Sequence, residues 1–311
     1  MNTRLSLLPL ALLASPLAAQ GDAKPFFVQE KNKGYDSLQR AVDAIGGGRG
    51  TILIAPGSYG DCAVQDRGQI AYVAREPGTA VFDGGICESK ATLVLGGRST
   101  RVEGLVFQNL RVPDKNGAGI RIEKGDLAIS ETLFRDSENG ILSARDPGGT
   151  VTIDRSTFSG LGGCIDGHGC SHGLYIGEYG KLIVRRSRFE RGTGGHYLKS
   201  RTREVEITDS SFDDSHGRAT NYMIDLPNGA TGLVARNMFV QGRDKENYSA
   251  FIMVAAENRS NSASGLTVTD NDAEIAPGID RSSSFVADKS GEPLRVENNR
   301  LGPRIAMLER R

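Results

Sequence analysis

The sequence predicts an all-β fold in which one chain coils into a parallel β-helix with an N-terminal capping helix. A strand pattern of alternating polarity recurs and ends in a bulky apolar residue, at positions 107, 134, 158, 189, 212, 239, 273 and 301. A second short apolar strand precedes most copies, and turns rich in Gly, Asn, Asp and Ser join the two. The repeats contain no helical pattern between strands, which excludes a doubly wound sheet.

Stacking explains why both strand patterns keep one register. When each repeat lies on the previous one, inward apolar residues align at a spacing of about 4.8 Å and form a continuous core. A polar position also repeats, two residues before the bulky one, at Ser156, Ser187, Ser210, Asn237, Asn271 and Asn299. We expect these six side chains to form a ladder that hydrogen-bonds from turn to turn.

The ends of the chain predict its location and its caps. Residues 1–19 have the pattern of a signal peptide, and their apolar run is too short to span a bilayer. We therefore expect a periplasmic or secreted protein with no membrane insertion. Residues 20–311 are expected to form one β-helix domain, with an N-terminal cap at about 35–48, rungs at about 51–302 and a C-terminal cap at about 303–311.

The cysteines and the charge balance limit the chemistry. In an oxidising compartment, sequence proximity favours the disulfides Cys62–Cys87 and Cys164–Cys170. A metal site formed by Cys164, His168, Cys170 and His172 is the alternative. Lys and Arg total 38, as do Asp and Glu, so there is no electrostatic case for a nucleic-acid partner.

Reactive side chains gather on neighbouring copies of the second strand. The residues that follow the apolar anchors Leu174, Leu198 and Ile224 point outward, and they are Tyr175, Lys199 and Asp225. Arg201 shares the face of Lys199, because side chains two positions apart lie on one side of a strand. Two positions before the anchors, His172, His196 and Tyr222 form a second column. The sequence therefore predicts one polar site on the outer wall.

These residue types fit eliminative cleavage of a uronate polysaccharide. That reaction needs a group that neutralises the carboxylate, a base for the C5 proton and an acid for the leaving oxygen. Lys199 is the candidate base, Arg201 the neutralising group, and His196 and Tyr175 the candidate acids. His172, Tyr222 and Asp225 are expected to contact substrate. No cofactor is certain from the sequence. Asp225 either binds Ca²⁺ or pairs with Lys199, and both alternatives are open.

The opening of the chain resembles a known superfamily. A helix pattern at residues 35–45 precedes Gly-Thr-Ile-Leu-Ile-Ala-Pro-Gly-Ser-Tyr at 50–59, similar to the start of right-handed β-helix proteins of the pectate lyase-like superfamily. The resemblance implies a right-handed coil. Lys199 and Arg201 look like the lysine–arginine pair of its chondroitinase B and alginate lyase group, which implies an acidic polysaccharide partner with lysine as base. In that group the two residues come from different rungs, whereas here they share one strand.

Two other functions stay open on the sequence. Tyrosines and basic side chains on one flank would also suit a non-catalytic glycan-binding or surface structural protein. Asp166-Gly167-His168-Gly169 and Asp213-Asp214 resemble elements of β-helical polygalacturonases, in which paired carboxylates hydrolyse the glycosidic bond. The order of the two elements is reversed here.

Overall fold

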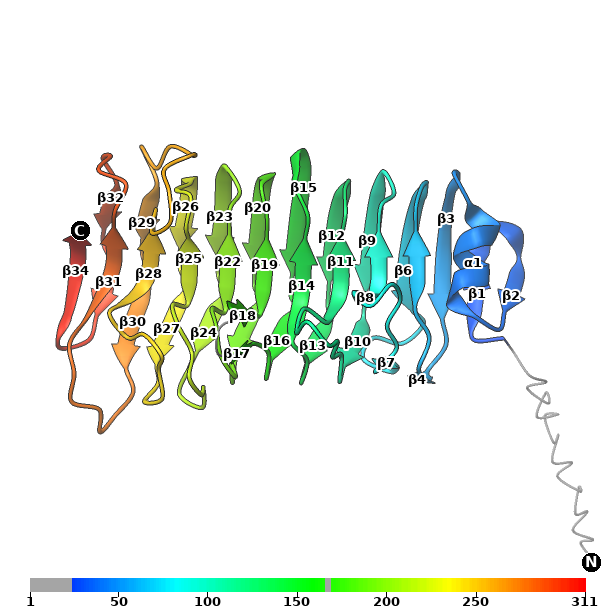
Figure 1. The fold of residues 1–311 in the computed structure, drawn as a ribbon, viewed down its shortest axis with the longest axis horizontal. Coiled ribbons are helices and arrows are strands. Elements are labelled where there is room, and N and C mark those ends of the chain that lie inside the picture. The colour runs from blue at the N-terminus through cyan, green and yellow to red at the C-terminus, as the bar shows by residue number, and fades with distance from the viewer. Residues whose placement is uncertain (1–23, 166–168) are drawn as a thin grey trace, which may run out of the picture.

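The computed structural model describes residues 24–165 and 169–311. The expected signal peptide lies outside the described residues, and so do Asp166, Gly167 and His168. The chain forms a parallel β-solenoid of about 9 turns, with α1 (Leu38–Ile45) at one end and β34 (Ile305–Arg310) at the other (Figure 1). The predicted fold class is confirmed. In the described ranges, no helix is long and apolar enough to cross a membrane.

Each turn of the solenoid contributes strands to three sheets. The first sheet has 12 strands: β1 (Phe26–Val28), β2 (Lys33–Tyr35), β3 (Arg49–Ile54), β6 (Gln69–Ala74), β9 (Ser99–Glu103), β12 (Asp126–Ser130), β15 (Asp146–Asp154), β20 (Tyr179–Arg185), β23 (Glu204–Thr208), β26 (Thr231–Ala235), β29 (Thr267–Thr269) and β32 (Arg295–Glu297). The second sheet has 10 strands: β4 (Gly57–Tyr59), β7 (Ala80–Asp83), β10 (Leu105–Gln108), β13 (Leu133–Arg135), β16 (Thr157–Ser159), β21 (Arg188–Glu190), β24 (Ser211–Asp213), β27 (Met238–Gln241), β30 (Asp272–Ile275) and β33 (Arg300–Leu301).

The third sheet also has 10 strands and carries the residues of the predicted site. Its strands are β5 (Ala63–Gln65), β8 (Ala91–Leu95), β11 (Ala118–Ile122), β14 (Asn139–Ser143), β19 (Leu174–Ile176), β22 (Leu198–Ser200), β25 (Ile224–Leu226), β28 (Ala250–Val254), β31 (Ser283–Asp288) and β34. A short 3₁₀ helix, η1 (Gln29–Lys31), and an antiparallel hairpin of β17 (Gly163–Ile165) and β18 (Gly169–Ser171) complete the elements.

The first strand pattern of each repeat looks continuous in the sequence. In the structure a sharp corner divides it into two strands. The stretch from Leu127 to Phe134, for example, forms β12 and β13 on different sheets. Between them Glu131 has a φ of 51°, a left-handed conformation that turns the chain in a single residue. Arg155 and Arg186 occupy the same corner on later turns, with φ of 44° and 48°. Each turn therefore has three strands in place of the two that the pattern shows.

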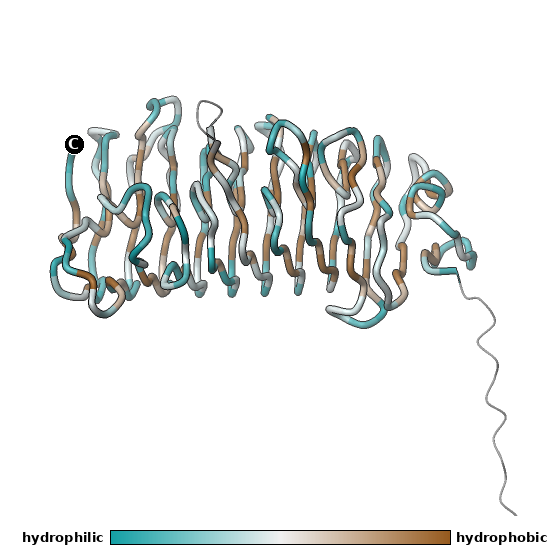
Figure 2. Tube along the Cα trace, turned by 60° about the horizontal axis from the view of Figure 1, so that its bottom comes forward, coloured by the Kyte–Doolittle hydropathy of each residue, from teal (hydrophilic) through white to brown (hydrophobic). Residues whose placement is uncertain are grey.

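Aromatic rings stack along the interior of the rod. The bulky positions of the repeat pair in register from Phe107 to Leu301. Successive rings from Phe82 to Phe239 lie with their centroids 4.7–5.5 Å apart and are at most 1% exposed. Hydrophobic positions recur at the same place on successive turns (Figure 2). This stack gives the rod a continuous core and confirms the predicted register.

The predicted polar ladder is present, and its main contacts are from side chain to backbone. The amide N–H of each ladder residue before Asn299 donates to the side-chain oxygen one turn further along, as from Ser187 to Ser210 (3.0 Å) and from Asn237 to Asn271 (2.9 Å). Within the asparagine segment, the Nδ2 group of Asn271 also donates to the side-chain oxygen of Asn299 at 2.8 Å. The ladder thus satisfies backbone groups at the buried corner.

We expect Asn271→Ala to lower the free energy of unfolding by about 3 kcal/mol, because it leaves the buried N–H of Asn237 without an acceptor. Asn271 is fully buried and makes bonds in both directions along the ladder. Urea unfolding measures the loss, and Asn299→Ala in the last, more exposed turn is the control with a smaller expected loss. Equal losses in the two variants would contradict a cooperative ladder.

The two ends of the rod differ from each other. The helix α1 covers the first turn with Leu38, Ala41 and Val42, and Ser37 accepts the N–H of Arg40 as its N-cap. The expected N-terminal cap is therefore present. At the other end, β34 pairs in parallel with β31 and continues the third sheet. Residues 305–310 are thus a strand of the last turn, where the sequence suggested a separate cap.

Both expected disulfides are formed. Cys62 is bonded to Cys87, and Cys164 to Cys170, which lie opposite each other in the hairpin of β17 and β18. Because the second disulfide uses both sulfurs, the alternative metal site around Cys164 and Cys170 has lost its thiolate ligands.

A candidate carboxylate-binding site on the third sheet

The outward side chains of β19, β22 and β25 line up along the rod. Tyr175 lies directly opposite Lys199, and Lys199 directly opposite Asp225. This alignment follows from the inward anchors Leu174, Leu198 and Ile224, which stack in the same register and fix which residues point out. The predicted column is confirmed.

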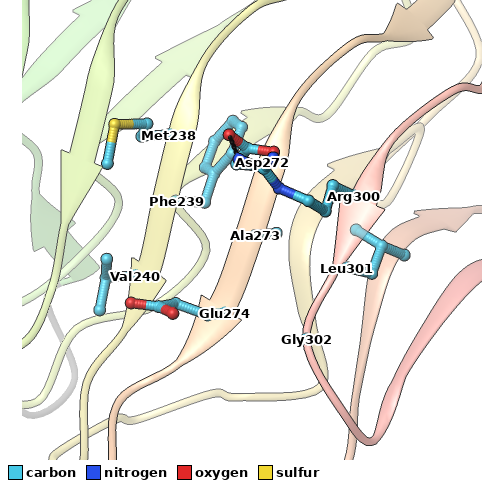
Figure 3. A pocket seen from close by; sticks show the side chains of 9 residues that line it. All are labelled: Met238, Phe239, Val240, Asp272, Ala273, Glu274, Arg300, Leu301 and Gly302. Atoms are coloured by element: carbon cyan, nitrogen blue, oxygen red, sulfur yellow. Dashed lines mark hydrogen bonds and ion pairs between the residues drawn. The ribbon is translucent and has the colours of Figure 1, made fainter.

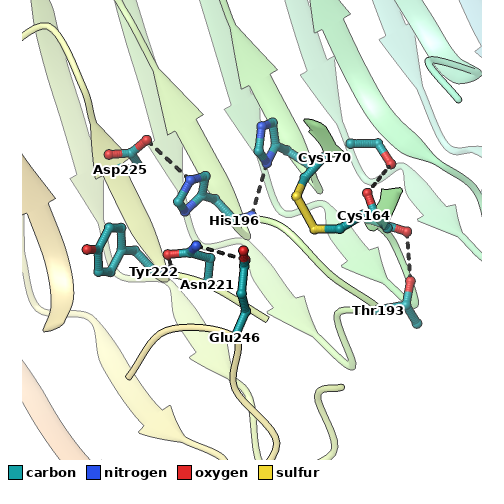
Figure 4. Close-up of a disulfide and its surroundings, with 12 residues drawn as sticks. Cys164, Cys170, Thr193, His196, Asn221, Tyr222, Asp225 and Glu246 are labelled. Carbon is teal, nitrogen blue, oxygen red and sulfur yellow. Dashed lines mark hydrogen bonds and ion pairs between the residues drawn. A yellow bond between two sulfur atoms is a disulfide. The ribbon is translucent and has the colours of Figure 1, made fainter. Parts of the chain in front are cut away.

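The second predicted column, His172, His196 and Tyr222, is also assembled. The rings of His172 and His196 stack with centroids 4.9 Å apart, and those of His196 and Tyr222 at 5.5 Å. The backbone N–H of His196 donates to Nδ1 of His172 at 3.0 Å, while Nε2 of His196 lies 3.4 Å from a carboxylate oxygen of Asp225 (Figure 4). The two columns therefore meet at Asp225.

A glutamate that the sequence analysis missed completes the site. One carboxylate oxygen of Glu257 accepts a hydrogen bond from Nζ of Lys199 at 2.6 Å, and the other accepts one from the guanidinium of Arg201. Each oxygen thus pairs with one cation, so Lys199 and Arg201 together hold a single carboxylate. Glu257 lies in an irregular loop after β28, and no repeat position indicates where its side chain goes.

Neighbouring side chains fix the position of Arg201. Its Nε donates to the hydroxyl of Tyr175 at 2.8 Å, and its Nη1 donates to Oδ1 of Asn228 at 2.5 Å. The ring of Tyr175 lies beneath both cations, 5.6 Å from Nζ of Lys199 and 5.9 Å from the guanidinium carbon. These contacts stabilise two neighbouring positive charges, Lys199 within β22 and Arg201 directly after its end.

The backbone of the Glu257 loop is held independently of its carboxylate. The amide N–H groups of Glu257 and Asn258 both donate to the carbonyl of Pro227, at 3.0 and 3.1 Å. The side-chain amide of Asn261 donates to the carbonyls of Arg201 and Thr202 at 3.1 and 3.2 Å. The loop can therefore keep its course while the Glu257 side chain rotates.

Burial separates the site from an ordinary charged surface. Lys199 is 9% exposed and Asp225 only 3%, although both point outward from the sheet. The sequence predicts only that these side chains point outward on the outer wall. The structure covers Lys199 with the side chain of Glu257, which is itself 43% exposed.

Burial also changes the protonation of the site. It raises the pKa of Asp225 to about 6, although Lys199 acts in the opposite direction. Burial lowers the pKa of His172 to about 3, and burial together with His172 and Lys199 lowers that of His196 well below its usual value. Burial acts to raise the pKa of Glu257, but hydrogen bonds from Lys199 and Arg201 outweigh it and the pKa is lowered. At neutral pH both imidazoles are uncharged and Glu257 is ionised.

We expect Asp225→Asn to become more stabilising, relative to the wild type, as the pH rises. The raised pKa means that protonated Asp225 favours the fold below about pH 4, and this contribution is lost as the pH passes through about 6. Asparagine resembles the protonated acid at every pH. The difference in unfolding free energy between variant and wild type should therefore rise by about 2–3 kcal/mol between about pH 4 and pH 7.5. Denaturant unfolding at both pH values measures it, and a constant difference would contradict the raised pKa.

The donor set around Asp225 does not fit Ca²⁺. Calcium takes six to eight oxygen ligands, whereas the partners of the Asp225 carboxylate are the amine of Lys199 and the imidazole of His196. Of the two alternatives left open by the sequence, the structure shows the pairing with Lys199, at 3.6 Å.

Other candidate features lie apart from this arrangement. Asp214 is fully buried, 3.2 Å from Nζ of Lys245, and accepts the hydroxyl of Tyr197 at 2.7 Å. Asp214 and Lys245 therefore form a buried structural ion pair. A hollow of about 340 Å³ on the second sheet is lined by residues that include Met238, Asp272 and Arg300 (Figure 3). Its paired charges, Asp272 and Arg300, neutralise each other.

Comparisons of the chain with protein-family models, with curated proteins and with solved structures give no match. The class of protein is therefore defined by the fold and by the site alone: a parallel β-solenoid with a carboxylate held by two cations on its outer wall.

Proposed function

We propose that this protein is a secreted or periplasmic polysaccharide lyase that cleaves a uronate-containing polymer by β-elimination. The observation that supports this most strongly is the single carboxylate held between Lys199 and Arg201. A uronate carboxylate in that place would be neutralised by two cations, which acidifies the proton on its C5 carbon. The likeness of Lys199 and Arg201 to the lysine–arginine pair of the chondroitinase B and alginate lyase group also supports this class of reaction.

The surrounding residues supply the remaining roles. With Glu257 displaced, Lys199 removes the C5 proton as an amine, and the C4–O bond breaks as the C4–C5 double bond forms. Tyr175, whose hydroxyl contacts Arg201 at 2.8 Å, gives a proton to the leaving oxygen. His196 is not suited to this role, because burial lowers its pKa and leaves the imidazole without the proton of the charged form. His172, Tyr222 and Asp225 position the sugar and the imidazole.

One observation favours a second function, the binding of an acidic glycan without cleavage. The amine of Lys199 is engaged at 2.6 Å by Glu257 and is 9% exposed, so it must lose this partner before it can reach a proton. A pure binding protein would need the same exchange in order to hold a carboxylate, but it would not need Lys199 to act as a base.

Incubation with a panel of acidic polymers separates the two functions. A lyase produces an unsaturated uronide that absorbs ultraviolet light, together with new chain ends. A binding protein retains the polymer and produces neither. Hydrolysis, which the polygalacturonase alternative requires, produces new reducing ends without the absorbance.

A further inference from the structure

The carboxylate of Glu257 occupies the place that the proposed function reserves for the substrate. It contacts both cations at once, one through each oxygen. Because Lys199 is only 9% exposed, a second carboxylate cannot reach its amine while Glu257 stays. Ligand and Glu257 therefore compete for one position.

The outward side chains that flank Tyr175 and Asp225 along the rod are apolar. The outward residues before Tyr175 are Leu142, 8% exposed, then Arg121, and then Val94, 2% exposed. The Arg121 side chain is 25% exposed and is paired with Glu123. The outward residues after Asp225 are Met253, 1% exposed, and Ala287, fully buried, which cluster with Tyr222. A polymer that lies lengthwise along the sheet would therefore meet the apolar Leu142 and Met253 close to the site on its two sides.

The same columns offer a second carboxylate no partner nearby. On successive strands the position of Lys199 is filled by Leu142, Tyr175, Asp225 and Met253. Strands of a sheet are about 4.8 Å apart, which is close to the length of one sugar unit. A chain with an acid on every sugar would thus place its neighbouring carboxylates over apolar side chains or over Asp225.

We propose that the Lys199–Arg201 pair recognises one carboxylate at the end of an acidic chain, in the place where the Glu257 carboxylate now lies. This inference rests on the proposed function and specifies its substrate as a chain terminus. The backbone of Glu257 stays bonded to Pro227, and its 43% exposed side chain rotates toward solvent to admit the ligand.

Glu257→Gln tests the exchange directly. The substitution removes the competing charge and keeps the size of the side chain, so it should tighten the binding of a free uronate. If the wild-type site is closed by Glu257 at least nine-tenths of the time, the dissociation constant falls about tenfold or more. Calorimetric titration with glucuronate, galacturonate and mannuronate measures this, with Glu257→Ala as a second variant. The exposed Glu274→Gln on the second sheet is the charge-matched control and should bind as the wild type does. Unchanged or weaker binding in both Glu257 variants would overturn the proposal.

Chain length tests the terminal mode of binding. The Glu257→Gln variant is titrated with oligouronates of about 2 and about 20 units. The dissociation constant, expressed per mole of oligouronate chain, should be the same for both lengths, because each chain has one recognised end. If interior sugars were bound as well, the longer chain would offer about ten times as many binding sites and its dissociation constant would be roughly tenfold lower. That result would overturn the proposal.

The failures of the two ideas are distinguishable. Tighter binding in Glu257→Gln with no unsaturated product from the wild type supports the exchange and contradicts the lyase. Unsaturated product from the wild type, with no gain in affinity in either Glu257 variant, supports the lyase and contradicts the exchange.

Discussion

Lys199→Ala is expected to lower kcat/KM for the uronate polymer by a factor of about 10²–10⁴, the usual contribution of a positioned base. The loss follows from geometry. The amine lies between Asp225 and Glu257, and in the proposed reaction it is the group nearest to the C5 proton of a carboxylate held by Arg201. The rate of ultraviolet absorbance increase at several substrate concentrations measures the change.

Controls separate this loss from misfolding. Lys199→Ala leaves Asp225 buried with one partner fewer, so Lys199→Met, which keeps the apolar stem, is made beside it. Lys289→Ala removes an exposed lysine that follows β31 and should keep full activity. Thermal unfolding of each variant shows whether the fold is retained. Full activity in both folded Lys199 variants would eliminate this residue as the base.

Phe189→Ala is expected to cause the largest loss of stability, about 3–5 kcal/mol. The ring lies in the middle of the aromatic stack, with the rings of Phe158 and Phe212 each 4.7 Å away, and it is fully buried. Its removal opens a cavity and ends the stacking on two turns at once. Denaturant unfolding measures the free energy of unfolding.

The control for this effect lies two turns further along the second sheet. Met238 lies in β27 of the same sheet, but it is 60% exposed. Met238→Ala should therefore change the free energy of unfolding by less than about 0.5 kcal/mol. If Phe189→Ala costs no more than Met238→Ala, the stack does not hold the rod together.

The sequence predicts the repeat register well because every turn contributes to it. Leu174, Leu198 and Ile224 are inward anchors, and once they stack, the outward partners Tyr175, Lys199 and Asp225 follow from the alternation of a strand. The Ser and Asn ladder is predictable for the same reason. These features depend on positions that recur at every turn.

Features outside the repeat could not be predicted in this way. The corner between the first two sheets is formed by left-handed residues such as Arg155 and Arg186, which lack the signal that glycine would give. Glu257 reaches the cations because its loop backbone bonds to Pro227 on the preceding turn, a tertiary contact with no trace in the repeat. The third strand of each turn and the covering of Lys199 are not marked by the repeat for these reasons.

The most direct test of the proposed active site is a screen of acidic polysaccharides for unsaturated product, with and without a chelator. A uronate polymer that is cleaved equally in both conditions, with release of an ultraviolet-absorbing unsaturated end, is the result that this account predicts. Absence of that product from every polymer tested, or its complete loss with the chelator, would contradict elimination by Lys199 and Arg201.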